Sequence, residues 1–393
     1  MNVLDQFRVS ELLLRHVAQN YTPKRMQGSD HDALLRFQRP AMEELSDLFT
    51  SDRGDRRRDY LNHPPYRAAY LLLYFLPNFL KAGLLTLTTA TRPTSDARIL
   101  DIGAGPASAS LGMAAGLRLL NPTLRSVEII ALDRSRSILR DAEELAARFS
   151  EQWGIAIRLR ARDGDLRTLI RKLPDHPVDH VVVANTVNEL LERKRGQLEP
   201  VELLDLLARL PQAARSSVWI IEPAQLPSAR FIQALRDIIA RENLGRILAP
   251  CVHSRDCCFN TPGNKNWCHT VWPWTPPGWY AAAQQALGHF SGALRLSYVV
   301  FSLAKQQNTA RAAKSFYRIV SQPMTDNNGP VLLLCGNGRC WRLRPGQHPA
   351  MWNALKQTCH RGQLIRLSDT ENSSEGIRLT RRTRLISAAP LEL

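Results

Sequence analysis

Three cysteines lie close together in the second half of the chain. Cys251, Cys257 and Cys268 fall within one short segment rich in proline, tryptophan and asparagine. Thiolates gathered this closely suit a thiophilic metal, and a small thiol-rich core without metal is the alternative. All seven cysteines follow residue 250, and an odd number of thiols confined to one region favours metal binding or redox chemistry over structural disulfides.

The spacing of these cysteines leaves the type of metal open. His253 and His269 are available to zinc, which accepts both imidazole and thiolate ligands. A four-iron cluster normally takes four cysteine thiolates, so it needs one more. The candidates for this fourth thiolate are Cys258, Cys335, Cys340 and Cys359.

A second group of chemically suitable residues follows three expected strands. Gly103 and Gly105 come directly after an apolar run and open the backbone to a ligand, while Asp101 is expected to fix the loop. Asp133 ends the next strand, where a carboxylate can accept hydrogen bonds from both ribose hydroxyls of a nucleoside. Asp165 follows the third strand, in a place suited to bind an adenine amino group. These features resemble the class I S-adenosylmethionine methyltransferases, whereas Asp133 taken alone would fit a solvated turn.

Polar residues also follow the fourth expected strand. Methyl transfer requires an acceptor held in line with the methyl group, and a base only if the acceptor carries a proton. Asn185, Asn188 and Glu189 are therefore candidate catalytic residues that would orient an acceptor. The alternative is that Asn188 and Glu189 cap a helix.

Strands and helices must alternate for these residues to meet at one edge of a sheet. Apolar runs of strand length alternate with helical stretches in the middle of the chain, which indicates an α/β fold with a parallel sheet covered on both faces. The expected strands are 97–102, 127–133, 156–161, 180–184 and 217–222. We predict a class I methyltransferase (Rossmann-like) sheet.

Changes in composition divide the chain into three expected regions. Residues 1–90 form a helical N-terminal region, with the aromatic residues around Tyr60 as core anchors. Residues 91–305 form the methyltransferase-like domain and include a Cys-rich, metal-binding insertion at 249–280. Residues 306–393 form a small β-rich C-terminal module.

The net charge of the chain indicates which class of partner it can attract. With 52 Lys+Arg against 36 Asp+Glu, the formal net charge is +16, which fits attraction to a polyanion such as nucleic acid. A generally basic, solvated surface is the alternative. The basic residues recur in three short clusters: Arg53, Arg56, Arg57 and Arg58; Arg193, Lys194 and Arg195; and Arg378, Arg381, Arg382 and Arg384.

The chain has no evident targeting or membrane segment. Asp5 and Glu11 interrupt the first residues, which argues against secretory and mitochondrial signals and favours a cytoplasmic, bacterial location. The longest apolar run, 68–76, ends at Pro77 and is expected to be a buried helix rather than a membrane span.

The cysteine segment and its surroundings resemble a known family. Pro250-Cys251, His253, Cys257, Trp267-Cys268-His269 and the Leu-Ser-Tyr-Val-Val run at 296–300 are similar to the methyltransferase-like family of mitochondrial small-ribosomal-subunit assembly factors, which also has bacterial members. The resemblance covers approximately residues 60 to 345. It implies a methyltransferase fold, association with the small ribosomal subunit, and a four-iron four-sulfur cluster held by four cysteines.

The resemblance also assigns the metal ligands. Cys251, Cys257 and Cys268 match the first three family cysteines, and Cys335, which follows an Arg-Ile-Val and proline pattern at 318–323, matches the fourth. Two positions depart from the family: Cys258 stands where proline is usual, and Thr270 stands where an aromatic residue is usual. Cys258 is therefore a competing ligand.

These observations support one leading hypothesis and two alternatives. The leading hypothesis is an S-adenosylmethionine-dependent methyltransferase-like protein with a structural four-iron cluster, acting on the small ribosomal subunit or its rRNA. The first alternative is a catalytically inactive assembly factor that binds rRNA. The second is a zinc-stabilised small-molecule methyltransferase, for which the positive charge would be incidental.

Overall fold

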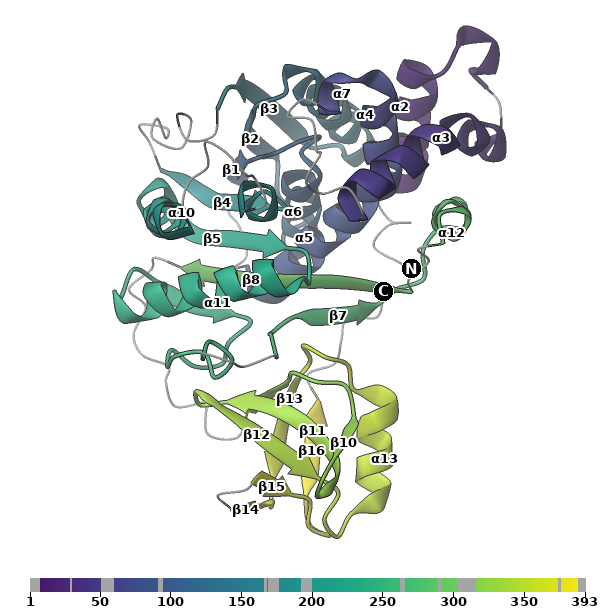
Figure 1. The fold of residues 1–393 in the computed structure, drawn as a ribbon. Coiled ribbons are helices and arrows are strands. Elements are labelled where there is room, and N and C mark those ends of the chain that lie inside the picture. The colour runs from purple at the N-terminus through teal and green to yellow at the C-terminus, as the bar shows by residue number, and fades with distance from the viewer. Residues whose placement is uncertain are drawn as a thin grey trace.

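The protein consists of a mixed α/β domain and a smaller β-rich module below it (Figure 1). The structure is a computed structural model. It describes residues 8–28, 30–50, 60–90, 95–165, 168, 177–191, 200–261, 266–288, 292–302, 316–373 and 376–387. The domain boundaries expected near residues 90 and 305 stay predictions, because segments 91–94 and 303–315 lie outside the described residues.

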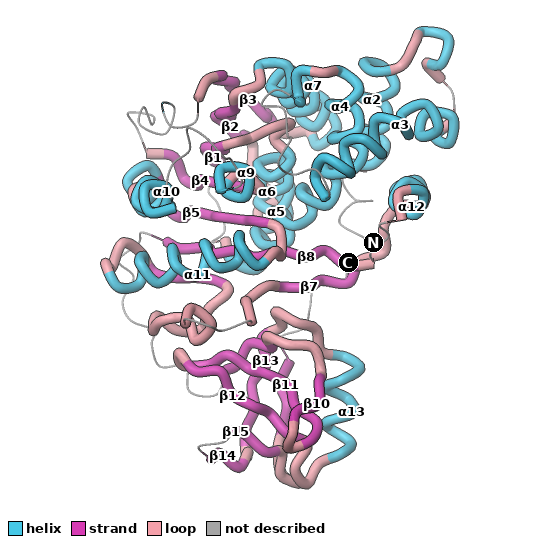
Figure 2. The backbone as a smooth tube through the Cα atoms, viewed as in Figure 1, coloured by secondary structure: helices cyan, strands magenta, loops and turns pink. Residues whose placement is uncertain are grey.

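A twisted sheet forms the centre of the larger domain (Figure 2). Its strands are β1 Asp96–Ile102, β2 Ser126–Asp133, β3 Ala156–Asp163, β4 Val178–Ala184, β5 Ala214–Glu222, β6 Arg246–Ala249, β7 Thr270–Pro273 and β8 Ala293–Ser302. The strand order is β3-β2-β1-β4-β5-β8-β6, with β7 paired to β8. Strands β1 to β5 are parallel, and β8 is antiparallel to β5, β6 and β7. The predicted Rossmann-like methyltransferase sheet is confirmed.

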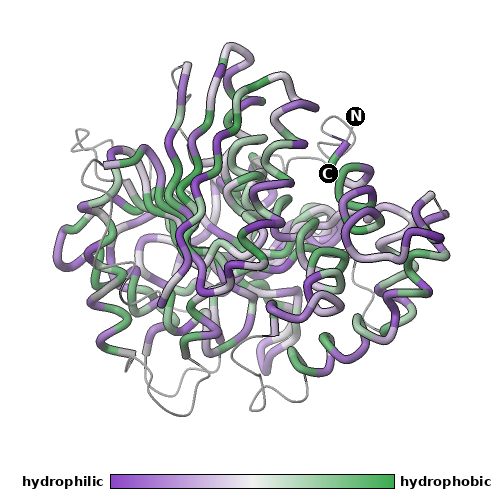
Figure 3. The backbone as a smooth tube through the Cα atoms, turned by 90° about the horizontal axis from the view of Figure 1, so that it is seen from above, coloured by the Kyte–Doolittle hydropathy of each residue, from purple (hydrophilic) through white to green (hydrophobic). Residues whose placement is uncertain are grey.

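Helices cover both faces of this sheet because neighbouring strand residues point to opposite sides. Ile99 packs with the N-terminal helices, whereas Leu100 packs with the helices of the other face. Figure 3 shows hydrophobic segments concentrated in the interior, where strands and helices meet. The first layer contains α2 Val9–Tyr21, α3 His31–Thr50, η3 Tyr60–Asn62, α6 Ser108–Leu120, α7 Arg136–Trp153 and α12 Gly278–Ala286. The second contains α10 Pro200–Ala208, η5 Leu210–Ala213 and α11 Leu226–Arg241.

One long helical stretch includes the buried helix expected at 68–76. It runs through Pro77 as α4 Pro64–Tyr70, the π-helical turn η4 Leu71–Phe75 and α5 Leu76–Thr89. Proline removes one helical hydrogen bond, and the wider π turn immediately before it accommodates that loss. By length and composition this stretch is apolar enough to cross a membrane, but 67% of its most apolar window is buried inside the protein. It packs as a core helix in this structure.

The long helix approaches α6 very closely because both helices carry glycine at the contact. A Cβ added at Gly112 would lie 2.1 Å from the backbone oxygen of Phe79, and one added at Gly116 would lie 2.8 Å from the oxygen of Gly83. Neither oxygen belongs to a flexible side chain. The position of the long helix against the sheet therefore depends on these glycines.

The C-terminal module is a small barrel. Strands β9 Phe316–Ile319, β11 Gly329–Gly336 and β12 Arg339–Arg344 pair antiparallel, and helix α13 Pro349–Thr358 leads to β13 Leu364–Ser368, which returns to β9. The final segment pairs at both ends of this sheet. Its first part, β15 Gly376–Arg378, is parallel to β12, and its second part, β16 Arg384–Ser387, is antiparallel to β13.

This connectivity is that of the OB-fold, a five-stranded Greek-key barrel. The parallel pairing of its third and last strands and the helix before its fourth strand follow the same plan. Two short strands, β10 Met324–Asp326 and β14 Glu371–Ser373, extend the barrel. The β-rich module is therefore confirmed.

We expect Gly112→Ala to lower the free energy of unfolding by roughly 1–3 kcal/mol, the usual cost of overpacking a core, because its new methyl group would overlap the Phe79 carbonyl. Gly278→Ala is the matched control, since an added Cβ there meets no atom within 4 Å. Urea denaturation of both variants checks this prediction. Equal stability of the two variants would contradict the close contact.

Candidate functional site

The carboxyl ends of the parallel strands meet at one edge of the sheet, and Glu222 organises that edge. Glu222 ends β5 and is almost fully buried. The backbone N–H groups of Thr186 and Val187 donate to its Oε1, and that of Asn188 donates to its Oε2. A single side chain therefore fixes the turn that follows β4.

The same turn positions the first loop of the sheet. The hydroxyl of Thr186 lies within hydrogen-bond distance of the carbonyl oxygens of Ile102 and Gly103. A Cβ at Gly103 would lie 2.1 Å from Thr186 Oγ1, so packing already requires glycine there, and its role in cofactor binding stays a prediction. Gly105 differs: it has φ +52°, and an added Cβ would meet no atom within 4 Å. Gly105 is thus the glycine that leaves open space.

The predicted acidic residues occupy different environments. Asp101 is buried and accepts hydrogen bonds from the backbone and hydroxyl of Ser110, so it fixes the start of α6. Asp133 is also buried, and its two carboxylate oxygens accept backbone N–H groups from Gly105 and Ser135 at 2.9 Å. Asp165 is exposed at the end of the neighbouring strand β3. The structure therefore joins Asp133 to the glycine loop and leaves Asp165 at the rim.

The three candidate acceptor residues lie in the turn after β4. Asn185 has φ +54°, a left-handed conformation that asparagine tolerates. Asn188 and Glu189 lie in the first turn of the short helix α9 Val187–Leu191. The side-chain oxygen of Asn188 is buried and has no hydrogen-bond partner among the described residues. Tyr60 donates its hydroxyl to Glu189 Oε1 at 3.1 Å.

The N-terminal helical region therefore forms part of the site. Tyr60 is buried, as expected of a core anchor, but it also contacts Glu189. Asn62 accepts a hydrogen bond from the Ser135 hydroxyl, next to Asp133. No local pattern predicts these contacts, because they join residues that are far apart in the chain.

Burial shifts the pKa values of the ionisable side chains at this edge of the sheet. It raises the pKa of Glu222 to about 8, and the three N–H donors offset only part of that rise. It likewise raises the pKa of Asp101 to about 7, against the hydrogen bonds from Ser110. Lys81 on α5 is half-buried, and desolvation of its amino group lowers its pKa to about 8 despite its attraction to Glu222.

These shifts predict a dependence of stability on pH. The pKa of Glu222 is about 8 in the folded protein and 4.5 for the free side chain. Its contribution to the free energy of unfolding is therefore complete below pH 4.5 and is lost as the pH rises toward 8. Between pH 5 and 7 Lys81 is almost fully charged in both the folded and the unfolded state and adds little slope. In the wild type, the titration of Glu222 should lower the free energy of unfolding by up to about 1 kcal/mol per pH unit over this range. We expect Glu222→Gln to remove this decline.

Urea denaturation at a series of pH values measures this slope. Glu242→Gln, at an exposed carboxylate beyond α11, is the control and should keep the wild-type slope. An unchanged slope in Glu222→Gln would show that Glu222 is ionised throughout this range.

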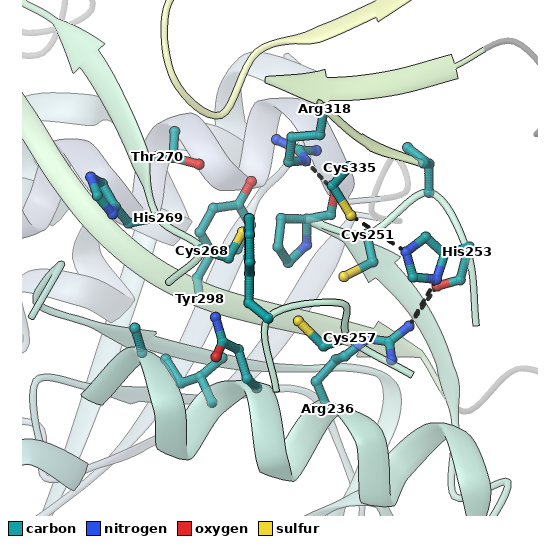
Figure 4. A pocket seen from close by; sticks show the side chains of 16 residues that line it. Arg236, Cys251, His253, Cys257, Cys268, His269, Thr270, Tyr298, Arg318 and Cys335 are labelled. Atoms are coloured by element: carbon teal, nitrogen blue, oxygen red, sulfur yellow. Dashed lines mark hydrogen bonds between the residues drawn. The ribbon is translucent and has the colours of Figure 1, made fainter. Parts of the chain in front are cut away.

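The four cysteines predicted as metal ligands line one buried pocket (Figure 4). Cys251 follows β6, Cys257 lies in the irregular segment beyond it, and Cys268 precedes β7. Cys335 comes from β11 of the barrel. Figure 4 shows the four sulfur atoms arranged around the same space. The pocket therefore joins the two parts of the protein.

Two arginines border the thiols. Arg236 of α11 is buried, forms an ion pair with Asp237 and donates to the backbone oxygen of His253 at 2.8 Å. Arg318 of β9 donates to the backbone oxygens of Pro250 and Gly362. Both side chains line the pocket and would compensate the negative charge of thiolates. The sequence analysis missed Arg236, since one arginine on an amphipathic helix carries no distinct signal.

A further pair of thiols lies beside this pocket. Cys258 Sγ donates to Cys335 Sγ at 3.8 Å, and His253 Nε2 lies 3.6 Å from the same sulfur. Cys340 is opposite Cys335 in the β11–β12 hairpin. Burial raises the pKa values of the Cys251 and Cys257 thiols, the latter to about 12. Among the described residues, the structure contains no group of three or more His, Cys, Asp or Glu side chains already positioned to hold a metal ion.

The basic clusters are only partly described. Arg378, Arg381, Arg382 and Arg384 are exposed on the barrel. The clusters at 53–58 and 193–195 lie outside the described residues. Of the three basic clusters, the structure therefore describes the one on the C-terminal module.

Several solved structures that resemble this one are described as methyltransferases, and their sequence identity to this chain is low. A protein from Listeria monocytogenes assigned to the class I S-adenosylmethionine-dependent methyltransferases has a TM-score of 0.39 and 13% identity, covering 78% of this chain and 90% of its own. Magnesium protoporphyrin IX methyltransferase from Synechocystis PCC 6803 has a TM-score of 0.33 and 10% identity, covering 67% and 100%. A protein from Pyrococcus horikoshii assigned to the RNA methyltransferases has a TM-score of 0.30 and 13% identity, covering 70% and 98%.

Sequence comparison identifies the family directly. A search of curated protein sequences finds no significant match. The family model described as mitochondrial small ribosomal subunit Rsm22 matches residues 68–342, which include the whole sheet, the cysteine segment and Cys335. The match covers more than half of the chain, and so the chain belongs to the Rsm22 family.

Proposed function

We propose that this protein is an S-adenosylmethionine-dependent methyltransferase-like factor that acts on the small ribosomal subunit or its rRNA. We further propose that Cys251, Cys257, Cys268 and Cys335 hold a structural four-iron four-sulfur cluster. The observation that carries the proposal is the buried pocket that brings these four thiols together from two parts of a chain in the Rsm22 family.

The sheet edge fits a nucleoside cofactor. Gly105 leaves open space beside Asp133, whose carboxylate has lone pairs beyond the two that accept backbone N–H groups. Asp133 would bind the ribose hydroxyls, Asp101 would hold the loop through Ser110, and Asp165 at the rim would bind the adenine amino group. S-adenosylmethionine supplies an electrophilic methyl group when bound.

The residues after β4 would position the acceptor. The unpartnered, buried oxygen of Asn188 can accept a hydrogen bond from an amino or hydroxyl group of the acceptor. Glu189 is held by Tyr60 and would take a proton from an acceptor that carries one. Asn185, in its left-handed conformation, would lie beside both.

The thiol pocket fits a cluster better than a single zinc ion. Four cysteine thiolates are the usual ligands of a four-iron cluster, one on each of four irons, whereas a single zinc ion requires all its ligands to converge on one point. Arg236 and Arg318 supply positive charge around the four thiols. A cluster there would tie the Cys-rich segment to the barrel through Cys335.

Positive charge supports an RNA partner. The chain carries a formal net charge of +16, and the barrel exposes the arginines of the 378–384 cluster to solvent. Contacts between cations and phosphates release counterions, so binding would weaken as salt rises.

The cofactor proposal predicts that Asp133→Ala weakens S-adenosylmethionine binding by about tenfold or more, because each lost hydrogen bond to a charged acceptor contributes ~1.5–3 kcal/mol. Gly105→Val should weaken binding further by filling the open space beside Asp133. Calorimetry measures the affinity, and Asp96→Ala at the opposite end of β1 is the control.

A transfer assay with labelled cofactor and small-subunit particles completes this test. We expect methyl transfer by the wild type and its loss in Asp133→Ala. Cofactor binding without any transfer would favour the catalytically inactive assembly factor. Absence of cofactor binding by the intact protein would contradict the proposal.

The cluster proposal predicts about four irons per chain and a brown absorbance after anaerobic purification. Cys257→Ser and Cys335→Ser should each abolish both signals, whereas Cys359→Ser, in the barrel core, should keep them. Loss of the cluster in Cys258→Ser with retention in Cys335→Ser would reassign the fourth ligand. Stoichiometric zinc with little iron would support the zinc-stabilised methyltransferase instead.

A further inference from the structure

A second cavity lies between the larger domain and the barrel. Its volume is about 360 Å³, within the range of pockets that bind small molecules. The end of α5 contributes Thr88 and Thr89, and β7 contributes Trp272. The barrel side contributes Arg318 and Gln363. The cavity thus combines an aromatic ring, a cation and several groups that form hydrogen bonds.

This cavity adjoins the four-thiol pocket. Cys251, Tyr298 and Arg318 line both spaces. Arg318 donates to the Pro250 backbone, which separates them. The position of Arg318 therefore depends on the same segment that carries the first cysteine.

The outer face of the barrel leads into the cavity. Phe316 of β9 pairs in register with Arg366 of β13, which pairs with Ile386 of β16. The Arg366 guanidinium lies 5.8 Å from the centre of the Phe316 ring, and Ile386 is 58% exposed. Arg318 and Leu364 lie two residues further along the same strands, on the same face, and line the cavity. We call Phe316, Arg366 and Ile386 the stacking platform.

The charge around this platform is positive. Arg366, Arg378, Arg381, Arg382 and Arg384 are exposed on the barrel, while the exposed acidic side chains among the described residues of 364–387 are Asp369 and Glu371. A polyanion is therefore the complementary partner. Aromatic rings and guanidinium planes on a basic surface are the means by which proteins bind unpaired bases.

The face that OB-folds commonly use for oligonucleotides is occupied here. That face lies on the second and third strands of the barrel. Leu333, Cys335 and Cys340 of β11 and β12 pack against Cys257 and Phe259 of the Cys-rich segment. A nucleic acid would have to use a neighbouring face, and the stacking platform is on the next strands.

We propose that the cavity and the stacking platform form a binding site for single-stranded RNA. One unpaired base would enter the cavity beside Trp272, and its neighbour would stack on Phe316 and Arg366. This inference rests on the proposed RNA function but names a different site from the methyl-transfer edge. It assigns to the barrel the recognition of an unpaired segment rather than of a duplex.

Fluorescence anisotropy tests this inference with a labelled 12-nucleotide oligouridine and a 12-base-pair RNA duplex at one near-physiological salt concentration. We expect the full-length protein to prefer the single strand. Phe316→Ala and Arg366→Ala should each weaken single-strand binding by about tenfold, the effect of losing one stacked base. Leu364→Trp, which places a large ring at the cavity wall, should weaken it similarly.

Lys356→Ala on α13 is the charge-matched control for Arg366→Ala and should change the affinity less than twofold. Thermal melting of each variant separates loss of binding from loss of folding. S-adenosylmethionine binding in the same samples reports on the other site and should be unchanged. If Phe316→Ala does not fold, Leu364→Trp still tests the cavity.

The outcomes separate this inference from the proposed function. Wild-type affinity in folded platform and cavity variants, equal binding to duplex, or no binding to either RNA would overturn the single-strand site. Small-subunit particles are titrated in parallel. Failure to bind them while the platform variants still lose oligouridine would overturn the ribosomal function and leave the RNA site in place.

Discussion

The hydrogen bonds from three consecutive backbone N–H groups to Glu222 determine how the edge of the sheet is arranged. They place Thr186 against the Gly103 loop, and the loop in turn brings the Gly105 N–H to Asp133. A buried carboxyl group is costly unless it is hydrogen-bonded, so this arrangement has few alternatives. The residues that would bind the cofactor and those that would hold the acceptor are therefore connected through one side chain.

The barrel has a structural role that its fold alone does not indicate. Its second and third strands carry Cys335 and Cys340 on the face that packs on the Cys-rich segment. That segment contains little regular structure between β6 and β7, so its conformation depends on what it contacts. Contacts with the barrel and around the thiol pocket therefore order these residues in place of the backbone hydrogen bonds of a helix or strand.

Much of the fold could be predicted from the sequence, because its signals are local. The strand of residues 96–102 and those that follow it carry long apolar runs, and the residues at their ends are the glycines and acids that such an edge requires. The π turn before Pro77 could not be predicted in this way, since its formation depends on packing around the helix. The packing of Gly103 against Thr186 could not be predicted either, because Thr186 is distant in the chain.

The cysteine site was predictable only in part. The local cluster of three thiols indicated a metal centre, but Cys335 was chosen through family resemblance and not through spacing. Arg236 and the Tyr60–Glu189 contact depend on the tertiary fold and have no sequence signature. Local patterns therefore identify which residues can do chemistry, and long-range packing decides what surrounds them.

The division of the four thiols between two parts of the chain has a consequence for protein synthesis. A ribosome makes the sheet and the first three proposed ligands, Cys251, Cys257 and Cys268, before it makes β9 and β11, and domains generally fold in that order. A nascent chain therefore holds a finished sheet beside an open, three-thiol surface until Cys335 emerges. Premature termination before Cys335 would leave that surface permanently without its fourth thiol, so closure of the pocket requires translation to have passed β11.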